Sequence, residues 1–381
     1  MPSPYDAPMD SSLVVVPPAV GRPLRLLPFR GWRLTPGRIG DPATARLFAR
    51  PYREVVERLD RWRDAGQLLE DHQPAVYVHE YTSAGLTVRG LVGALDISHR
   101  ATSTDDRTVV PHEGIHPDQV TDLADRMSTW QLNPAPILLV HRGPQTVREL
   151  VDRALTQSPL HEYVDRADQR HRVWAIHDPV ELDDLNAGLA SSRALIADGH
   201  HRYAAYLRMQ QQVPGGANDR GLAMLVDQAV TPLFLGAIHR TLVGTSLDEL
   251  GRACPPISTF APVAAAEAYA ALSQDTLVAT DGESWATIKL ALPPDRAAVE
   301  VLHDDLLPAL GVADRRLGFH HSVDEALGRL RTAPGVAILM PAPDFDLVVR
   351  VAQAGRLLPE KATSFQPKPS IGVLIRSLRD E

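Results

Sequence analysis

The stretch Ile196–Tyr203 reads IADGHHRY and marks the passage from a buried strand to a helix. The apolar run that ends at residue 197 is typical of a buried strand, and the Asp-Gly pair directly after it is typical of a tight turn. Apolar side chains then recur at helical spacing over residues 201–211, until Pro-Gly-Gly at 214–216 ends the helix. We therefore expect a strand, a glycine turn and a helix in direct succession.

Five positions after this strand carry residue types that favour a site for a negatively charged group. The first turn of a helix exposes backbone N–H groups at the positive end of the helix dipole, where phosphate binds well. In the purely structural alternative, Asp198 caps the helix and Arg202 is a surface cation. We favour the anion site because so many polar groups in succession after a buried strand indicate a use beyond folding. The five residues are Asp198, Gly199, His200, His201 and Arg202.

Length, composition and charge narrow the class of protein. The 381 residues suffice for two or three domains or for one large domain, and 44% hydrophobic with 23% charged residues is ordinary for a globular protein. A net charge of -8 argues against a dedicated nucleic-acid binder. The single cysteine, Cys254, cannot form an internal disulfide, and no apolar run reaches membrane-spanning length. We expect a cytoplasmic protein with neither a membrane nor a nucleic-acid partner.

Strand and helix patterns alternate along most of the chain, which is typical of an α/β fold with a mixed sheet. Two α/β portions are expected, at 23–245 and 246–381, after a loose proline-rich tail at 1–22. In the first portion we expect strands at 24–29, 75–81, 86–97, 136–140, 173–176, 194–197, 222–226 and 234–243, and helices at 51–69, 117–132, 147–155, 179–189 and 201–211. In the second we expect helices at 261–272, 323–331 and 345–354, and strands at 276–280, 285–292 and 336–340.

Lysine is rare in this chain, which otherwise uses arginine for positive charge. The three lysines are Lys289, Lys361 and Lys368, and the last two lie in one segment near the C-terminus. A compact ammonium group can coordinate phosphate as a point charge, which a planar guanidinium does less well. The segment is therefore either part of a phosphate site or a plain surface loop.

The residues His112–His116 read HEGIH and match the HExxH pattern of zinc proteases. That chemistry needs both histidines on one face of a helix, and Pro111, Gly114 and Pro117 argue against a helix here. We interpret the stretch as a loop in which Glu113 is a general base or a metal ligand, with a solvated loop as the alternative. The chain contains neither a GxGxxG nor a GxxxxGK[ST] phosphate loop.

Three motifs, in this order along the chain, resemble the bacterial and archaeal domain-of-unknown-function 1015 family. The resemblance extends from about residue 24 to residue 372. That family is itself distantly similar to the free serine kinases of the ParB/sulfiredoxin-like superfamily, in which a Gly-His-His-Arg turn holds nucleotide phosphates. The resemblance implies a ParB/sulfiredoxin-like core with a second α/β portion. The motifs are His112-Glu113, IADGHHRY at Ile196–Tyr203, and GRLLPEKATSFQPK at Gly355–Lys368.

Carried over residue by residue, the resemblance implies roles for the candidate residues. Family members commonly carry Pro-Pro-Tyr-Asp early in the chain, where this chain has Arg53 in place of the acid, so retention of catalytic activity is open. The Lys-Ser-Thr of the C-terminal motif here reads Lys361-Ala362-Thr363. The implied catalytic residues are Glu113, Asp198 and His200, and the implied nucleotide-binding residues are Gly199, His200, His201, Arg202, Lys361 and Lys368, with no resident metal site.

Three functions remain in competition. The first is an ATP- or ADP-dependent phosphotransferase, aided by Mg²⁺, that acts on a small hydroxylated metabolite such as serine. The second is a regulatory protein that binds a nucleotide or phosphometabolite without turnover. The third is a metal-dependent hydrolase that would use His112, Glu113 and the histidines at 200 and 201. The oligomeric state is not predicted.

Overall fold

A computed structural model describes residues 14–49, 54–254, 258–311 and 317–379 of the chain. Arg53, where the family pattern has an acid, lies outside the described residues. By residue contacts the chain divides into two compact units. The larger unit takes in residues 15–111, 115–233 and 367 onward, and the smaller unit takes in residues 112–114 and 234–366. The boundary at residue 245 stays a prediction.

The larger unit is built on a 10-stranded mixed sheet with the strand order β1-β7-β12-β9-β13-β6-β5-β11-β10, in which β2 also pairs with β6. A separate four-stranded sheet has the order β4-β3-β22-β8. The strands are β1 (Val20–Gly21), β2 (Leu26–Leu27), β3 (Gly31–Leu34), β4 (Leu68–Glu70), β5 (Val76–Ser83), β6 (Leu86–Asp96), β7 (Arg107–Val110), β8 (Leu132–Asn133), β9 (Ile137–His141), β10 (His161–Val164), β11 (Arg170–Ile176), β12 (Ala194–Asp198), β13 (Arg220–Asp227) and β22 (Ile375–Ser377).

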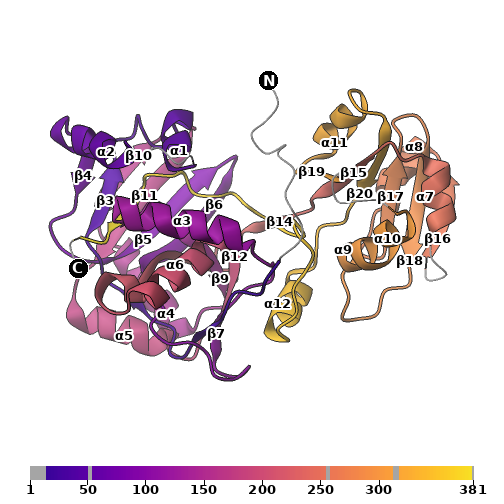
Figure 1. Ribbon diagram of the computed structural model, residues 1–381. Helices are drawn as coiled ribbons and strands as arrows, with labels where there is room; N and C mark the ends of the chain where they lie inside the picture. Colours follow the sequence, from indigo (N-terminus) through magenta and orange to yellow (C-terminus); the bar gives the residue numbers. More distant parts are fainter. Residues whose placement is uncertain (1–13, 50–53, 255–257, 312–316, 380–381) are drawn as a thin grey trace. The chain divides into compact units, whose positions relative to one another are not determined.

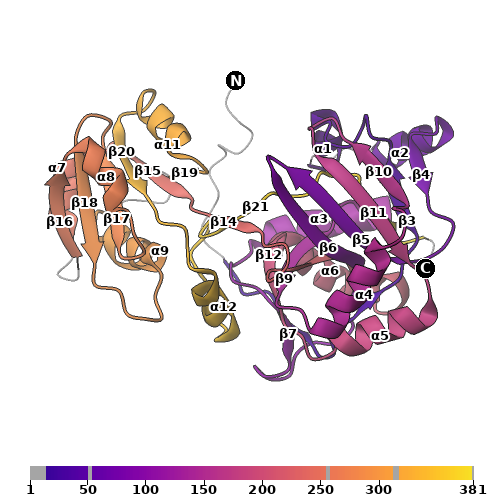
Figure 2. The ribbon, with the colours of Figure 1, turned by 180° about the vertical axis from the view of Figure 1, so that it is seen from behind.

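Helices cover one face of the large sheet and bury its apolar side chains. Figure 1 shows α3 and α6 in front of the strands, and from behind the strands β5, β6 and β11 come first (Figure 2). One core cluster joins alternate strand residues, such as Leu139 and Leu225, with α3, α4, α5 and α6. The helices are α1 (Pro42–Ala49), α2 (Val55–Asp64), α3 (Pro117–Trp130), α4 (Gln145–Leu155), α5 (Pro179–Leu189), α6 (His200–Gln212) and the 3₁₀ helix Gly216–Asp219.

The smaller unit contains a six-stranded sheet of order β16-β18-β17-β20-β15-β19 and a short pair, β14-β21. Its strands are β14 (Phe234–Gly236), β15 (His239–Val243), β16 (Ser258–Val263), β17 (Thr276–Thr280), β18 (Trp285–Leu290), β19 (Leu317–His320), β20 (Gly335–Leu339) and β21 (Ser364–Gln366). Its helices are α7 (Leu247–Ala253), α8 (Ala265–Ala271), α9 (Ala298–Val301), the π-helix Leu302–Leu306, α10 (Leu307–Ala309), α11 (Val323–Leu330) and α12 (Phe345–Gln353).

The predicted mixed α/β fold is confirmed, and three local predictions are wrong. The expected helix at 51–69 ends at Asp64, and Leu68–Glu70 form β4. The expected helix at 261–272 begins only at Ala265, because the residues before it form β16, which pairs along its length with β18. Pro262 is tolerated there because β16 is an edge strand. The expected single strand at 234–243 is two strands in different sheets, since β14 pairs with β21 and β15 with β19 and β20. None of the helices in the described part of the chain combines the length and apolar character that a membrane crossing needs.

Helix α5 provides a direct test of local stability. The Asp178 carboxylate accepts hydrogen bonds from the backbone N–H groups of Val180 (2.8 Å) and Glu181 (3.1 Å), so Asp178 is the N-cap of this helix. We expect Asp178→Ala to lower the free energy of unfolding by about 1 kcal/mol, because the two N–H groups lose their partner. Urea unfolding measures this, with Asp184→Ala on the exposed side of the same helix as the control. An equal loss in both variants would contradict the capping role.

Candidate functional site

Two helices of the larger unit begin side by side at the carboxyl ends of two neighbouring strands. Strands β7 and β12 are parallel neighbours, and α3 and α6 follow them in the chain. The imidazole rings of His116, before α3, and His201, in the first turn of α6, stack with centroids 5.7 Å apart and planes 8° apart. Neither N-cap residue, His116 or Gly199, caps its helix through a side chain. Carboxyl ends of parallel strands followed by helix starts are the usual place for ligands in α/β sheets.

The turn between β12 and α6 requires glycine. Gly199 has a φ of +92°, in the left-handed region that residues with a Cβ rarely adopt. A Cβ added there would stand 2.9 Å from Nη2 of Arg202. The predicted succession of strand, glycine turn and helix is therefore confirmed, and the guanidinium of Arg202 lies directly over the turn.

Arg202 is directed at the protein's own backbone. Its Nη1 donates to the carbonyl oxygens of Pro136 (2.7 Å) and Ala135 (3.3 Å), and its Nη2 donates to Oδ2 of Asp198 (2.7 Å). These bonds join the start of β9 to the end of β12. The guanidinium thus has a structural role in addition to the positive charge that it brings to the turn.

The two histidines of the motif differ in environment. His200 is the first residue of α6 and is buried, whereas His201 is partly exposed. Nε2 of His201 accepts a hydrogen bond from the backbone N–H of His116 at 3.0 Å. That nitrogen therefore carries no proton, so His201 either is neutral with its proton on Nδ1 or must break this bond to become charged.

Lys368 reaches the same turn from the far end of the chain. Its ammonium donates to Oδ1 of Asp198, so the Asp198 carboxylate lies between Lys368 and Arg202. The Lys368 side chain is 49% exposed and that of Asp198 is 28% exposed. Two predicted site residues that are 170 positions apart in sequence therefore meet within the larger unit.

Side chains outside the three sequence motifs fix the segment around Lys368 by hydrogen bonds. The Tyr81 hydroxyl donates to the Pro367 carbonyl (2.7 Å), and Nε2 of Gln169 donates to the Lys368 carbonyl (3.0 Å). Oε1 of Gln169 accepts from the backbone N–H of Ser370 at 3.2 Å. Sequence reasoning missed Tyr81 and Gln169, since a tyrosine in a strand and a glutamine in a loop are too common to signal a site.

A buried network supports the loop that carries Gln169. Nδ1 of His171 lies 3.0 Å from Nε2 of His79, and Nε2 of His171 lies 3.0 Å from Oδ2 of Asp165. Oδ1 of Asp165 accepts from the Gln169 backbone N–H at 2.9 Å. Burial lowers the pKa of both histidines, and hydrogen bonds from its neighbours lower that of Asp165 despite its burial. The network therefore consists of two neutral imidazoles and one carboxylate near neutral pH.

Glu113 belongs to the smaller unit and lies outside any helix. Its backbone forms a bridge with Leu358, so residues 112–116 cannot present the zinc-protease geometry. The side chain is 18% exposed, and burial raises the pKa of Glu113 to about 7, although the charge of Lys361 and the N–H groups at 362 and 363 oppose this. The Thr363 hydroxyl lies 3.4 Å from Oε1 of Glu113 and 2.7 Å from Nε2 of the buried His112.

Lys361 occupies an uncommon backbone conformation beside Glu113. Its φ is +55°, in the left-handed region, and its side chain is exposed. The buried Arg240 donates through Nη2 to the Lys361 carbonyl (3.0 Å) and the Glu360 carbonyl (3.2 Å). Such a conformation persists only where the surroundings enforce it, and Arg240 supplies that constraint.

The predicted site residues thus fall into two groups. Asp198, Gly199, His200, His201, Arg202 and Lys368 lie together in the larger unit, and Glu113 and Lys361 lie together in the smaller unit. Within the described ranges, no three or more His, Cys, Asp or Glu side chains are grouped so as to hold a metal ion.

Comparison with solved structures finds distant likenesses. A free serine kinase mutant in complex with ADP is 15% identical, with 70% of this chain and 89% of that chain covered and a TM-score of 0.39. SbnI with a C-terminal truncation, from Staphylococcus aureus, is 11% identical, with 76% and 90% covered and a TM-score of 0.43. A conserved hypothetical protein from Pyrococcus furiosus is 14% identical, with 72% and 93% covered and a TM-score of 0.39.

Comparison by sequence is more decisive for the family. No curated protein matches the chain. One family, described as "Protein of unknown function (DUF1015)", matches residues 26–304, which is more than half of the chain. That range includes Glu113 and the whole IADGHHRY motif, while the segment with Lys361 and Lys368 lies beyond it. The protein therefore belongs to the DUF1015 family.

Proposed function

We propose that this protein is a nucleotide-dependent phosphotransferase that acts on a small hydroxylated metabolite, with serine as the first acceptor to test. The observation that carries the proposal is the ammonium of Lys368 beside Asp198, where α3 and α6 begin. A phosphate group needs several donors and a positive potential, and this corner offers both. The choice of ATP or ADP as donor follows from the sequence resemblance to free serine kinases.

The charges at this corner favour an anion. Lys368 and Arg202 bring two positive charges and Asp198 one negative charge, so one positive charge is left over. Each helix start adds roughly half a positive charge. The side chains of Lys368 and Asp198 are partly exposed, so a ligand can approach them.

Glu113 suits the proton-accepting step better than Asp198 does. Transfer to a hydroxyl group requires an acceptor for its proton, and a base is most effective when its pKa is near the working pH. Burial brings the pKa of Glu113 to about 7. Both oxygens of the Asp198 carboxylate already accept hydrogen bonds, one from Lys368 and one from Arg202, so neither is free to take up a hydroxyl proton. We therefore assign the base role to Glu113 and give Asp198 the role of positioning Lys368 and Arg202.

We expect Lys368→Met to weaken nucleotide binding about tenfold, because one charge-assisted contact to a phosphate is lost. Isothermal titration calorimetry with ATP and with ADP measures this. Lys289→Met is the matched control, since Lys289 is an exposed lysine on β18 of the smaller unit. Unchanged affinity in the Lys368 variant would remove this corner from nucleotide binding.

An assay for phosphoryl transfer distinguishes the proposed phosphotransferase from a regulatory protein that binds nucleotide without turnover. Incubation with ATP labelled at the γ-phosphate, or ADP labelled at the β-phosphate, and a pool of amino acids should yield a labelled phosphorylated amino acid. If the protein binds nucleotide through Lys368 but yields no labelled product with any hydroxylated acceptor, it is a sensor. That result refutes the phosphotransferase proposal. Failure to bind either ATP or ADP refutes both the phosphotransferase and the nucleotide sensor.

A further inference from the structure

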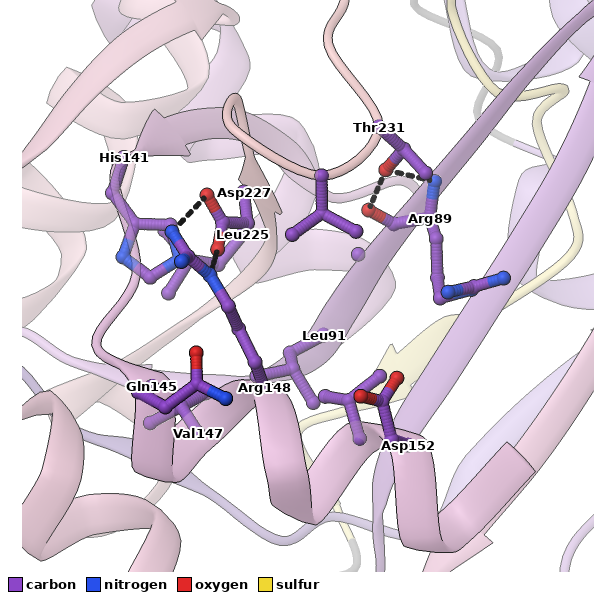
Figure 3. A pocket seen from close by; sticks show the side chains of 13 residues that line it. Arg89, Leu91, His141, Gln145, Val147, Arg148, Asp152, Leu225, Asp227 and Thr231 are labelled. Carbon is purple, nitrogen blue, oxygen red and sulfur yellow. Dashed lines mark hydrogen bonds and ion pairs between the residues drawn. The ribbon is translucent and has the colours of Figure 1, made fainter. Parts of the chain in front are cut away.

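The smaller unit contains a buried arginine that is not paired with an acid. Arg240 in β15 is 1% exposed, and within the described residues its guanidinium forms no ion pair. Figure 3 shows a different arrangement in the larger unit, where Arg148 at a cavity of about 180 Å³ donates through Nε to Oδ2 of Asp227 at 2.6 Å. A buried charge is costly unless it is paired and hydrogen-bonded, so the contacts of Arg240 indicate what it is used for.

Backbone carbonyls and one histidine take the place of an acid around Arg240. Its Nη1 donates to the Ile238 carbonyl, and its Nη2 donates to the carbonyls of Glu360 (3.2 Å) and Lys361 (3.0 Å). Its Nε lies 3.4 Å from Nε2 of His303, which burial keeps neutral by lowering its pKa to about 3. His303 lies in the π-helix, and π-helical turns occur often at functional sites.

The turn that Arg240 holds also carries donors for the Glu113 carboxylate. The Thr363 hydroxyl donates to Oε1 of Glu113 at 3.4 Å. Burial raises the pKa of Glu113, and the backbone N–H groups of Ala362 and Thr363 act against this because they favour the charged carboxylate. Lys361 in the same turn has a φ of +55°, a conformation that persists only under a constraint such as Arg240. The placement of these donors therefore depends on the contacts of Arg240.

Both ends of the segment 358–363 are joined to residues 112 and 113, and Arg240 holds its middle. At one end, the backbone N–H of Leu358 donates to the His112 carbonyl at 2.8 Å. At the other end, Oγ1 of Thr363 lies 2.7 Å from Nε2 of the buried His112. In the described part of the chain Arg240 forms no hydrogen bond to Glu113 itself, so it acts on Glu113 through this segment.

The charge of Arg240 favours the same result. Burial lowers the pKa of Arg240 to about 10, and the negative charges of Glu113 and Glu360 oppose this, so the guanidinium stays positive at neutral pH. A positive charge nearby favours the ionised form of a carboxyl group. The other charged or titratable groups around Glu113 are Lys361, which also favours its ionised form, Glu360, which disfavours it, and the neighbouring His112.

We propose that Arg240 is a positioning residue for the base Glu113: it holds the turn at residues 360–363 so that the Glu113 carboxylate stays oriented, and it supplies a positive charge that favours the ionised form. Because the base role of Glu113 belongs to the proposed function, the catalytic part of this inference rests on that function. The effect of Arg240 on the Glu113 carboxylate is a property of the folded protein and is measurable without turnover.

Titration of Glu113 by ¹³C NMR tests this effect directly. The full chain is labelled at the glutamate carboxyl groups, and Glu113→Gln identifies the signal. In Arg240→Met the titration midpoint should move to higher pH by at least about 0.5, because the positive charge and the hold on the turn are lost. Arg240→Lys keeps the charge without the planar pair of donors and should reverse part of this change. Arg329→Met, at an exposed arginine of α11, is the control and should leave the midpoint unchanged.

An unchanged midpoint in Arg240→Met overturns the proposal. If the methionine variant does not fold, Arg240→Gln takes its place, because its amide still donates to a carbonyl of the turn while the charge is removed. The same change of midpoint is expected there, and its absence likewise overturns the proposal.

Initial rates of phosphoryl transfer distinguish this inference from the proposed function. In Arg240→Met the rise of the rate with pH should move with the NMR midpoint, which lowers the rate at pH 6 about threefold or more. The affinity for ATP and ADP should stay within about twofold of wild type. A moved midpoint in a protein whose wild type transfers no phosphoryl group refutes the proposed function and supports the effect of Arg240 on Glu113. An active wild type with an unmoved rate profile in Arg240→Met overturns the role of Arg240 alone.

Discussion

Replacing Glu113 by glutamine is expected to lower phosphoryl transfer at least a hundredfold. The glutamine amide keeps the size of the side chain and cannot accept the hydroxyl proton, and general-base catalysis contributes about 10²–10⁴-fold. Because burial raises the pKa of Glu113 to about 7, the wild-type rate should rise between about pH 6 and pH 8 as the carboxylate forms, and then level off. Initial rates with labelled nucleotide across this pH range measure both effects.

Stability distinguishes this catalytic role from a structural one. The folded-state pKa of Glu113 is above its ordinary value, so its contribution to stability is fully present at low pH and is lost as pH rises through about 7. At pH 8 the glutamine variant should therefore unfold at the same temperature as wild type or higher, while its activity is lost. Glu283→Gln, at an exposed turn of the smaller unit, is the control and should retain activity. A Glu113→Gln protein with a normal rate would disprove the base assignment.

Replacing His171 by phenylalanine is expected to lower the free energy of unfolding by about 3 kcal/mol or more. His171 bonds to both His79 and Asp165, and all three side chains are buried. Removing it leaves the buried carboxylate of Asp165 and the buried imidazole of His79 each without one hydrogen-bond partner. Unpaired buried polar groups are among the most destabilising results of a single substitution. Urea unfolding measures the loss. His72→Phe, at an exposed position, is the control, and a difference below about 1 kcal/mol between the two variants would contradict the network's role.

The same network predicts a pH dependence with the opposite sign to that of Glu113. Burial depresses the pKa of His79 and His171 below the ordinary value of 6.5, so the unfolded chain binds more protons than the folded chain below that pH. Stability should fall as pH decreases from about 6.5, and less steeply in His171→Phe. Because Asp165 also holds the loop with Gln169, the variant should bind nucleotide more weakly through Lys368.

Several features of the protein were predictable from the sequence because they depend on neighbouring residues. The glycine turn between β12 and α6 follows from the need for a positive φ at Gly199, and the cap of α5 follows from Asp178 before a proline. The absence of a helix at residues 112–116 follows from the prolines around them. The alternation of apolar segments indicated the mixed α/β class for the same reason.

The sequence by itself determined the glycine turn before α6 and the cap of α5, since turn and cap rules act over a few residues, and its motifs determined the family. Only the tertiary structure brought Lys368 to Asp198, turned Arg202 onto the carbonyls of Ala135 and Pro136, and buried Glu113 so that its pKa rises. It also placed the buried Arg240, which belongs to no motif, against the carbonyls of Glu360 and Lys361. These contacts join residues tens to hundreds of positions apart, and the order of strands in the sheet, which no short-range rule encodes, decides which of them meet.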